Sequence, residues 1–185
     1  MFAKILDTFL NPEIDYHQYK SNNVVDQYYS AARKGGSAFY SIQDYFKFKS
    51  THIKNIFTIL PTPYYAEFTG TGLVTPHIDG GKDTVALNYY LNVGGGDETV
   101  FYKKKNDSVL PYPNTNSYNV NDLDELGRFS AKPFEAWLLD VKKIHGIIKQ
   151  DDQTRTMITF RWKHYSFEEI YNSLNVGKDS WSNIE

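Results

Sequence analysis

His77 and Asp79 lie two residues apart in the stretch TPHIDGGKDTVALNYYLN, residues 75–92. Alternate residues of a β-strand project from the same face, so both side chains could reach one metal ion. The pair alone carries little information, because five His and 22 acidic residues in a chain of 185 give about 0.6 such pairs by chance. Gly80 and Gly81 follow directly and would let the chain turn away from the site.

A second histidine and an arginine lie further along the chain. His145 belongs to an apolar run, and Arg155 opens the next run after the polar turn at 149–153. We expect the two runs to form neighbouring antiparallel strands, with Arg155 beside His145. Two imidazoles and one carboxylate that leave open coordination positions form the facial triad of non-haem iron oxygenases. The planar fork of an arginine suits a carboxylate ligand, because it can bind both oxygens.

Taken in order, these residues resemble the Fe(II)- and 2-oxoglutarate-dependent dioxygenases, most closely their prolyl-4-hydroxylase-like branch. The shared pattern consists of H-x-D at 77–79, Y-Y-L-N at 89–92, GGDETVFY at 95–102, His145, and Arg155 ten residues later. The resemblance covers roughly residues 56–163. It implies a double-stranded β-helix with the metal between two sheets.

The resemblance also implies residue roles. His77, Asp79 and His145 would be the Fe(II) ligands. Arg155 would bind the distal carboxylate of 2-oxoglutarate, and Tyr90 would donate a hydrogen bond to the same carboxylate. Related halogenases lack the carboxylate ligand, so the presence of Asp79 favours hydroxylation.

Alternation along two later runs indicates which side chains face the site. Asn88 shares a strand face with Tyr90, so we predict that both face the cosubstrate. Arg155 shares a face with Met157 and Arg161, and Arg161 is the reserve candidate for the cosubstrate. Structural alternatives stay open for these residues, including a salt bridge from Arg155 to the acidic residues at 151–152.

The chain departs from the family pattern at three positions. Phe68 stands where some relatives carry a tyrosine that holds the cosubstrate, and we take Tyr64, on the same face of that run, as its replacement. Ala136 stands where relatives often have glycine. Met157 stands where a small hydroxyl residue is common. These departures bear on the cosubstrate pocket rather than on the metal.

The segment pattern predicts a mainly β (α+β) fold, a double-stranded β-helix of the jelly-roll or cupin-like kind with N-terminal helices packed on one sheet. We predict one domain over 1–185, with an N-terminal strand and helices at 1–55, a β-helix core at 56–163 and a C-terminal helix and tail at 164–185. Asn11 and Pro12 suggest a helix start, and Gly35 a helix end. The predicted strands are 56–60, 64–69, 73–79, 84–92, 98–103, 135–141, 144–149 and 155–163. Ser166 and Glu169 predict a capping box for the last helix.

Residues 103–132 are polar and rich in turn-forming residues, and we expect a long loop that is either a substrate-binding lid or a surface excursion. The absence of cysteine excludes thiolate metal sites and disulfides. A net charge of −2 gives no reason to expect nucleic acid or a membrane as partner. No run is long and apolar enough for a membrane span, and the N-terminus does not read as a signal peptide, so we expect a cytoplasmic protein.

Two functions fit these residues. The first is an Fe(II)- and 2-oxoglutarate-dependent dioxygenase that uses O2 to hydroxylate a C–H bond and releases succinate and CO2. Its substrate would be a peptide or protein side chain, a free amino acid or another small molecule. The second is a non-catalytic, cupin-like β-barrel that binds metal or ligand without oxidising anything.

Overall fold

The computed structural model describes residues 2–5, 10–30, 35–43, 61–70 and 72–175. Its strands are β1 (Phe2–Ile5), β2 (Lys20–Ser30), β3 (Gly35–Ile42), β4 (Thr62–Phe68), β5 (Gly72–His77), β6 (Asp83–Val93), β7 (Glu98–Lys104), β8 (Leu123–Ser130), β9 (Ala136–Asp140), β10 (Ile144–Lys149) and β11 (Arg155–Lys163). Two short 3-10 helices, η1 (Tyr16–Tyr19) and η2 (Val120–Asp122), and one α-helix, α2 (Phe167–Asn175), complete the described elements.

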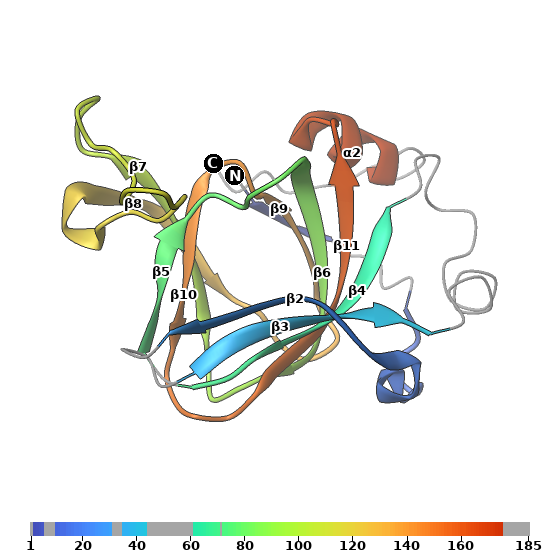
Figure 1. The fold of residues 1–185 in the computed structure, drawn as a ribbon. Helices are drawn as coiled ribbons and strands as arrows, with labels where there is room; N and C mark the ends of the chain where they lie inside the picture. The colour runs from blue at the N-terminus through green and yellow to red at the C-terminus, as the bar shows by residue number, and fades with distance from the viewer. Residues whose placement is uncertain (1, 6–9, 31–34, 44–60, 71, 176–185) are drawn as a thin grey trace.

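The strands form two antiparallel sheets that face each other across the barrel in Figure 1. The large sheet has the order β1-β9-β6-β11-β4-β3-β2, and the small sheet the order β5-β10-β7-β8. From β4 to β11 the chain passes repeatedly between the sheets, so that β4, β6, β9 and β11 lie in the large sheet and β5, β7, β8 and β10 in the small sheet. This is the winding of a jelly roll. The predicted double-stranded β-helix is therefore confirmed by the strand order itself.

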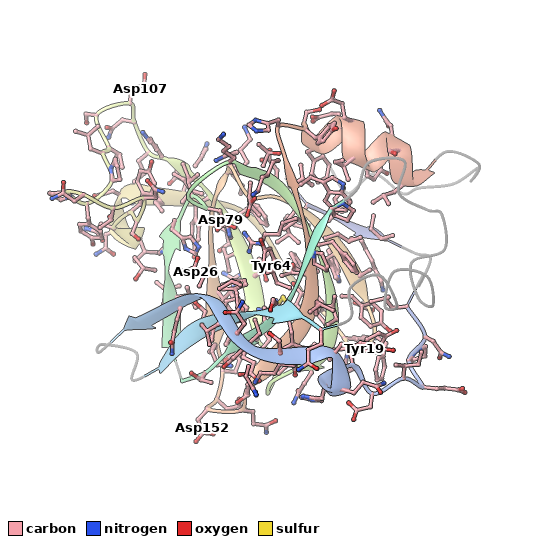
Figure 2. The ribbon with its side chains drawn as sticks, turned by 45° about the vertical axis from the view of Figure 1, so that its right-hand side comes forward. Tyr19, Asp26, Tyr64, Asp79, Asp107 and Asp152 are labelled. Carbon is pink, nitrogen blue, oxygen red and sulfur yellow. The ribbon has the colours of Figure 1, made fainter. Side chains whose placement is uncertain are left out.

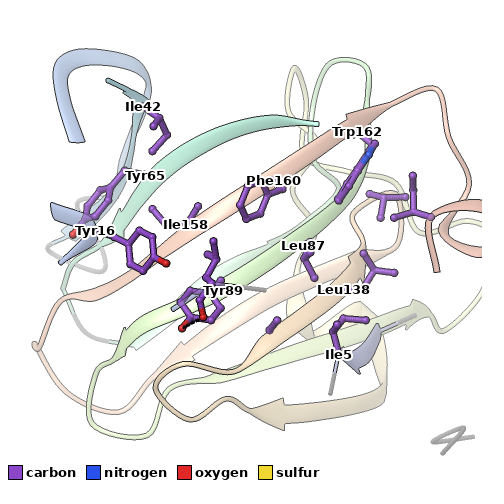
Figure 3. Close-up of a cluster of buried hydrophobic side chains, with 14 of the residues drawn as sticks. Ile5, Tyr16, Ile42, Tyr65, Leu87, Tyr89, Leu138, Ile158, Phe160 and Trp162 are labelled. Carbon is purple, nitrogen blue, oxygen red and sulfur yellow. Dashed lines mark hydrogen bonds between the residues drawn. The ribbon is translucent and has the colours of Figure 1, made fainter. Parts of the chain in front are cut away.

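Alternation along the two central strands gives the large sheet two different faces. One face carries large buried side chains that form the outer core shown in Figure 3: Leu87, Tyr89, Ile158, Phe160 and Trp162, with Tyr65 and Leu138 from the neighbouring strands. The other face turns toward the small sheet. A one-residue register slip would exchange the two faces, so burial of this apolar set fixes which side chains enter the barrel.

The outer core is covered by the two ends of the described chain. Leu10, Ile14 and Tyr16 pack on it from the N-terminal side, and Phe167 and Ile170 of α2 pack on it from the C-terminal side. The capping box predicted for that helix is confirmed, because the backbone N–H of Glu169 donates to Ser166 Oγ and that of Ser166 donates to Glu169 Oε2.

The predicted N-terminal helices are wrong. Only η1 is helical between residues 10 and 30, and β2 and β3 extend the large sheet beyond β4. Asn11 does begin a turn, since its side chain accepts from the N–H of Glu13, but the turn leads to η1 and then to β2. β2 is eleven residues long and pairs with β3 despite two irregularities in the register, and the backbone hydrogen bonds of this pairing override the local helix-start signal.

The long loop predicted for 103–132 is also partly wrong, because β8 pairs with β7 and closes one edge of the small sheet. Only two of its residues, Leu123 and Phe129, are buried apolar side chains, which explains why its strand character is weak in the sequence. The predicted run at 56–60 lies outside the described residues. In the part of the chain that is described, no helix has the length and apolar character needed to cross a bilayer.

Candidate active site

Three predicted ligands meet inside the barrel. His77 is the last residue of β5 and stands opposite His145 of β10 in the strand register, while Asp79 follows just beyond the end of β5. Asp79 Oδ1 lies 3.3 Å from Nε2 of His77 and 3.4 Å from Nε2 of His145. The three ligand atoms all lie within 4.8 Å of one another, a spacing that one metal ion could bridge.

Each imidazole is oriented by its own backbone. Nδ1 of His77 lies 2.8 Å from the carbonyl oxygen of Thr75, and Nδ1 of His145 lies 2.9 Å from that of Lys143. Because a carbonyl only accepts, both rings carry their proton on Nδ1 and present the lone pair of Nε2 to the centre of the cluster. This tautomer is the one that a metal requires, so the donor set fits a divalent cation with two nitrogen ligands and one oxygen ligand.

The carboxylate of Asp79 is kept charged by its surroundings. Burial alone would raise its pKa, but the Arg161 guanidinium and the two histidines hold the pKa of Asp79 well below its usual value. Burial lowers the pKa of His77, but the hydrogen bond and negative charge of Asp79, together with the bond to the Thr75 carbonyl, outweigh it and raise the pKa overall. The segment that carries Asp79 is fixed by its N–H, which donates to the carbonyl of Val141, and by Lys142, which donates to the carbonyl of Gly81.

A cavity of about 780 Å³ lies between the sheets and contains the three ligands in its wall. Its described lining also includes Tyr64, Phe68, Asn88, Thr99, Arg155, Met157 and Arg161, together with Phe39 of β3 and residues 114–117. Figure 2 shows Asp79 and Tyr64 on the inside of the barrel. The cavity therefore joins the predicted metal ligands to three of the predicted cosubstrate residues, Arg155, Asn88 and Tyr64, whereas Tyr90 lies behind its described lining, against Arg155.

Arg155 forms the inner end of this central cavity. It is 2% exposed, its Nη2 donates to Thr99 Oγ1 over 2.9 Å, and its guanidinium lies 4.6 Å from the centre of the Tyr90 ring. Its Nε and Nη1, and the hydroxyl of Tyr90, are buried and have no hydrogen-bond partner among the described residues. Buried donors left unpaired cost about 1–3 kcal/mol each. Their gathering beside the cavity indicates a place built to receive an acceptor-rich, anionic group.

The relation expected between Arg155 and His145 is wrong in one respect. β10 and β11 are not paired but belong to different sheets, so Arg155 reaches the cavity from the large sheet and His145 from the small sheet. The salt-bridge alternative for Arg155 is not found in the described chain. Asp151 instead accepts from the backbone N–H groups of Gly95 and Gln153.

Asn88 and Tyr64 both line the cavity, in a polar row that crosses three strands. Thr159 of β11 stands between them, opposite Tyr64 on one side and Asn88 on the other. Asn88 Oδ1 and Thr159 Oγ1 are buried without a partner in the described structure. Alternation along the last strand places Thr159 on the same face as Arg155, and the motif GGDETVFY contains Thr99, but sequence reasoning gave neither residue a role.

Arg161, the reserve candidate for the cosubstrate, has a different partner. Its Nη1 donates to Asp79 Oδ2, and its guanidinium also lies 5.1 Å from the centre of the Phe39 ring. It therefore belongs to the metal end of the cavity and Arg155 to the far end.

No family model matches the chain, and no curated protein does. Among solved structures, it is similar to a 2OG-Fe(II) oxygenase family oxidoreductase from Burkholderia pseudomallei, with 8% identity and a TM-score of 0.44 over 78% of this chain and 73% of that one. It is also similar to E. coli ycfD, with 12% sequence identity and a TM-score of 0.44, and the match covers 97% of this chain and 55% of that one. A mutant of Bacillus subtilis oxalate decarboxylase OxdC has 10% sequence identity and a TM-score of 0.37, and the match covers 71% of this chain but only 27% of that one. Similarities this low add nothing to the strand order, on which the fold assignment rests.

Proposed function

We propose that this chain is an Fe(II)- and 2-oxoglutarate-dependent oxygenase that hydroxylates a C–H bond. One observation carries the proposal: a single cavity contains a His-Asp-His cluster at one end and, at the other, a buried arginine with two unpaired nitrogens. A dicarboxylate with a 2-oxo acid at one end has the matching chemistry, because one end can chelate a metal and the other can pair with a guanidinium.

The residues have separate tasks in this proposal. His77, Asp79 and His145 would hold Fe(II), which when bound supplies the O2 chemistry that converts 2-oxoglutarate to succinate and CO2 and oxidises the substrate. Arg155 would bind the distal carboxylate, since it lines the cavity and its Nε and Nη1 are buried without a partner in the described structure. Tyr90 would donate to the same carboxylate.

The polar row and the enclosing walls would complete the binding site. Asn88 and Tyr64 line the cavity and offer hydrogen-bonding groups between its two ends, and Thr159 stands between them in the strand register. The apolar walls formed by Phe68, Met157 and the neighbouring residues would exclude water, which strengthens each charged contact. For the substrate we propose a peptide or protein side chain, or a free amino acid, in keeping with the prolyl-4-hydroxylase-like pattern of the sequence.

A non-catalytic, cupin-like binding protein is the second candidate. Phe68 and Met157 favour it, because both line the cavity where a tyrosine and a small hydroxyl residue would give a dicarboxylate further hydrogen bonds. Such a protein would keep the metal cluster and bind a ligand without turning over 2-oxoglutarate.

Anaerobic spectroscopy and a turnover assay distinguish the two candidates. Addition of Fe(II) and 2-oxoglutarate without O2 should produce a metal-to-ligand charge-transfer band, and admission of O2 should then yield succinate. Arg155→Ala should abolish the band, whereas Arg128→Ala, a surface arginine paired with Glu98 and Glu125, should keep it. Metal binding without the band and without succinate would support the binding protein instead.

A further inference from the structure

Two turns meet at the end of the barrel that carries Arg155. Residues 94–97 connect β6 of the large sheet to β7 of the small sheet, and residues 150–154 connect β10 of the small sheet to β11 of the large sheet. Both turns lie at the lowest part of the barrel in Figure 1, and Figure 2 places Asp152 of the second turn far from Asp107 at the opposite end. We call these two segments the turn pair.

The turn pair is joined by a buried ion pair. Lys149 Nζ donates to Asp97 Oδ2 over 2.8 Å, and both side chains have zero exposure to solvent. Lys149 also donates to the carbonyl of Gln153, and Asp97 Oδ1 accepts from the N–H of Gln150. Each charge therefore has a second hydrogen bond, and each of these bonds involves the 150–154 turn.

A second contact joins the same turns through the backbone. The N–H of Gly95 donates to Asp151 Oδ1 over 3.2 Å. A Cβ atom at Gly95 would lie only 1.8 Å from Asp151 Oδ2, so this close approach requires glycine. The glycine that opens the motif GGDETVFY therefore contacts the polar turn that follows the strand of His145.

The turn pair stands next to the inner end of the central cavity. Asp97 precedes Thr99 by two residues on the small-sheet side, and Lys149 bonds to Gln153, two residues before Arg155 on the large-sheet side. The hydrogen bond from Arg155 to Thr99 crosses from one sheet to the other. Asp97 and Lys149 are neighbours within the small sheet, at the ends of the paired strands β7 and β10, and both bond to the 150–154 turn that leads into Arg155. The conformation of this turn therefore sets where the guanidinium lies.

A contribution to stability does not by itself explain why two charged residues occupy these buried positions. Hydrophobic residues of similar volume often replace a buried ion pair with no loss of stability, whereas the ion pair fixes one geometry. We propose that Asp97 and Lys149 are positioning residues: they hold the 150–154 turn in the conformation that places Arg155 against Thr99 and so matches the cavity to the length of the dicarboxylate. This inference rests on the proposed function for the identity of the ligand.

The test is the double variant Asp97→Leu/Lys149→Met, which removes both charges together and leaves neither unpaired. Lys20→Met/Glu67→Leu is the matched control, because it removes a lysine–glutamate pair of 2.7 Å in the large sheet whose members do not line the cavity. Three quantities are measured. The first is the NMR signal of Arg155 Nε–H, which is identified by its loss in Arg155→Lys, and the second is the affinity for Mn(II), a redox-inert metal. The third is the affinity of the Mn(II) protein for 2-oxoglutarate compared with 2-oxoadipate, which is one methylene longer.

In the double variant the Arg155 Nε–H signal should shift while Mn(II) affinity stays unchanged. The affinity for 2-oxoglutarate should fall about tenfold, as for other residues that orient a binding group. Because one methylene is usually worth tenfold or more in discrimination, the preference for 2-oxoglutarate over 2-oxoadipate should shrink to about threefold or less. The control variant should match the wild type in all three quantities.

An unshifted Arg155 signal and an unchanged preference in a folded double variant would overturn the proposal. If that variant does not fold, Asp97→Glu, which keeps the charges but lengthens one partner, should shift the same signal and weaken 2-oxoglutarate binding; wild-type values there would also overturn it. A wild-type protein that binds no 2-oxoglutarate would refute the proposed function, while the Arg155 signal would still decide whether the ion pair positions Arg155.

Discussion

Arg161 and Asp79 form an ion pair that divides the two oxygens of the carboxylate between two partners. Nη1 of Arg161 donates to Oδ2, while Oδ1 faces the Nε2 atoms of both histidines. Asp83 lies 3.7 Å from the same Nη1. With one oxygen held by the guanidinium, Asp79 offers a single oxygen to a metal, which leaves coordination positions open for other ligands.

Removal of the Arg161 guanidinium should show that a bound metal ion can replace it in compensating the negative charge of Asp79. Arg161→Met leaves the Asp79 charge without its main partner, so we expect the metal-free protein to lose about 2–3 kcal/mol, below the range for a fully buried pair. A bound cation would supply the missing charge, so Mn(II) should raise the melting temperature more in the variant than in the wild type. Thermal unfolding with and without Mn(II) checks this, with Arg128→Met as the exposed control. Equal stabilisation of both proteins by Mn(II) would contradict it.

Tyr90 should show opposite effects on stability and on ligand binding. Its hydroxyl is buried without a partner in the described structure, so Tyr90→Phe removes a desolvated group and should leave the ligand-free protein as stable as the wild type or about 1 kcal/mol more stable. The same change should weaken 2-oxoglutarate binding by about five- to tenfold, through the loss of one hydrogen bond to a charged group. Urea unfolding and titration of the Mn(II) protein measure the two effects. A loss of stability with unchanged binding would assign Tyr90 to packing alone.

Gly146 should be required for the spacing of the two histidines. A Cβ atom at this position would lie 2.7 Å from the carbonyl oxygen of Val74, a backbone atom that cannot move without β5. Gly146→Ala should therefore displace β5 from β10 beside the His77–His145 pair and lower Mn(II) affinity by about tenfold or more. Gly127→Ala, whose Cβ would meet only the ring of Phe2 at 3.6 Å, is the control. Equal Mn(II) affinity in both variants would show that β5 adapts.

Tyr65 should make the protein sensitive to alkali. Burial raises the pKa of Tyr65 to about 12 from an ordinary value of 10.0. The folded state thus keeps its proton where the unfolded state loses it, so the stabilisation is complete below pH 10 and declines between about pH 10 and 12. Tyr65→Phe should flatten this decline, measured as the free energy of unfolding in urea at several pH values. A spectrophotometric titration in which Tyr65→Phe loses no late-ionising tyrosine would contradict the expectation.

The sequence alone was sufficient to predict that His77, Asp79 and His145 come together as a candidate metal site, and to predict most of the barrel. His77 and Asp79 are close along the chain, and alternation on β6 and β11 separates the apolar face from the face that carries Asn88 and Arg155. Both signals are local, because strand geometry converts a spacing of two residues into a shared face. The prediction of N-terminal helices was wrong because it, too, rested on a local signal. A helix start at Asn11 is a local signal, and pairing between β2 and β3 is not.

Only the tertiary structure decided what the two arginines do. Arg155 and Arg161 share one face of one strand, and nothing in the sequence says which of them meets a metal ligand. Winding of the chain between two sheets brings Asp79 to Arg161 and Thr99 to Arg155. The ion pair of Asp97 and Lys149 joins residues that are 52 positions apart and that are neighbours across β7 and β10 within the small sheet. Such contacts depend on which strands pair and on how the two sheets face each other, relations that no local pattern of residues encodes.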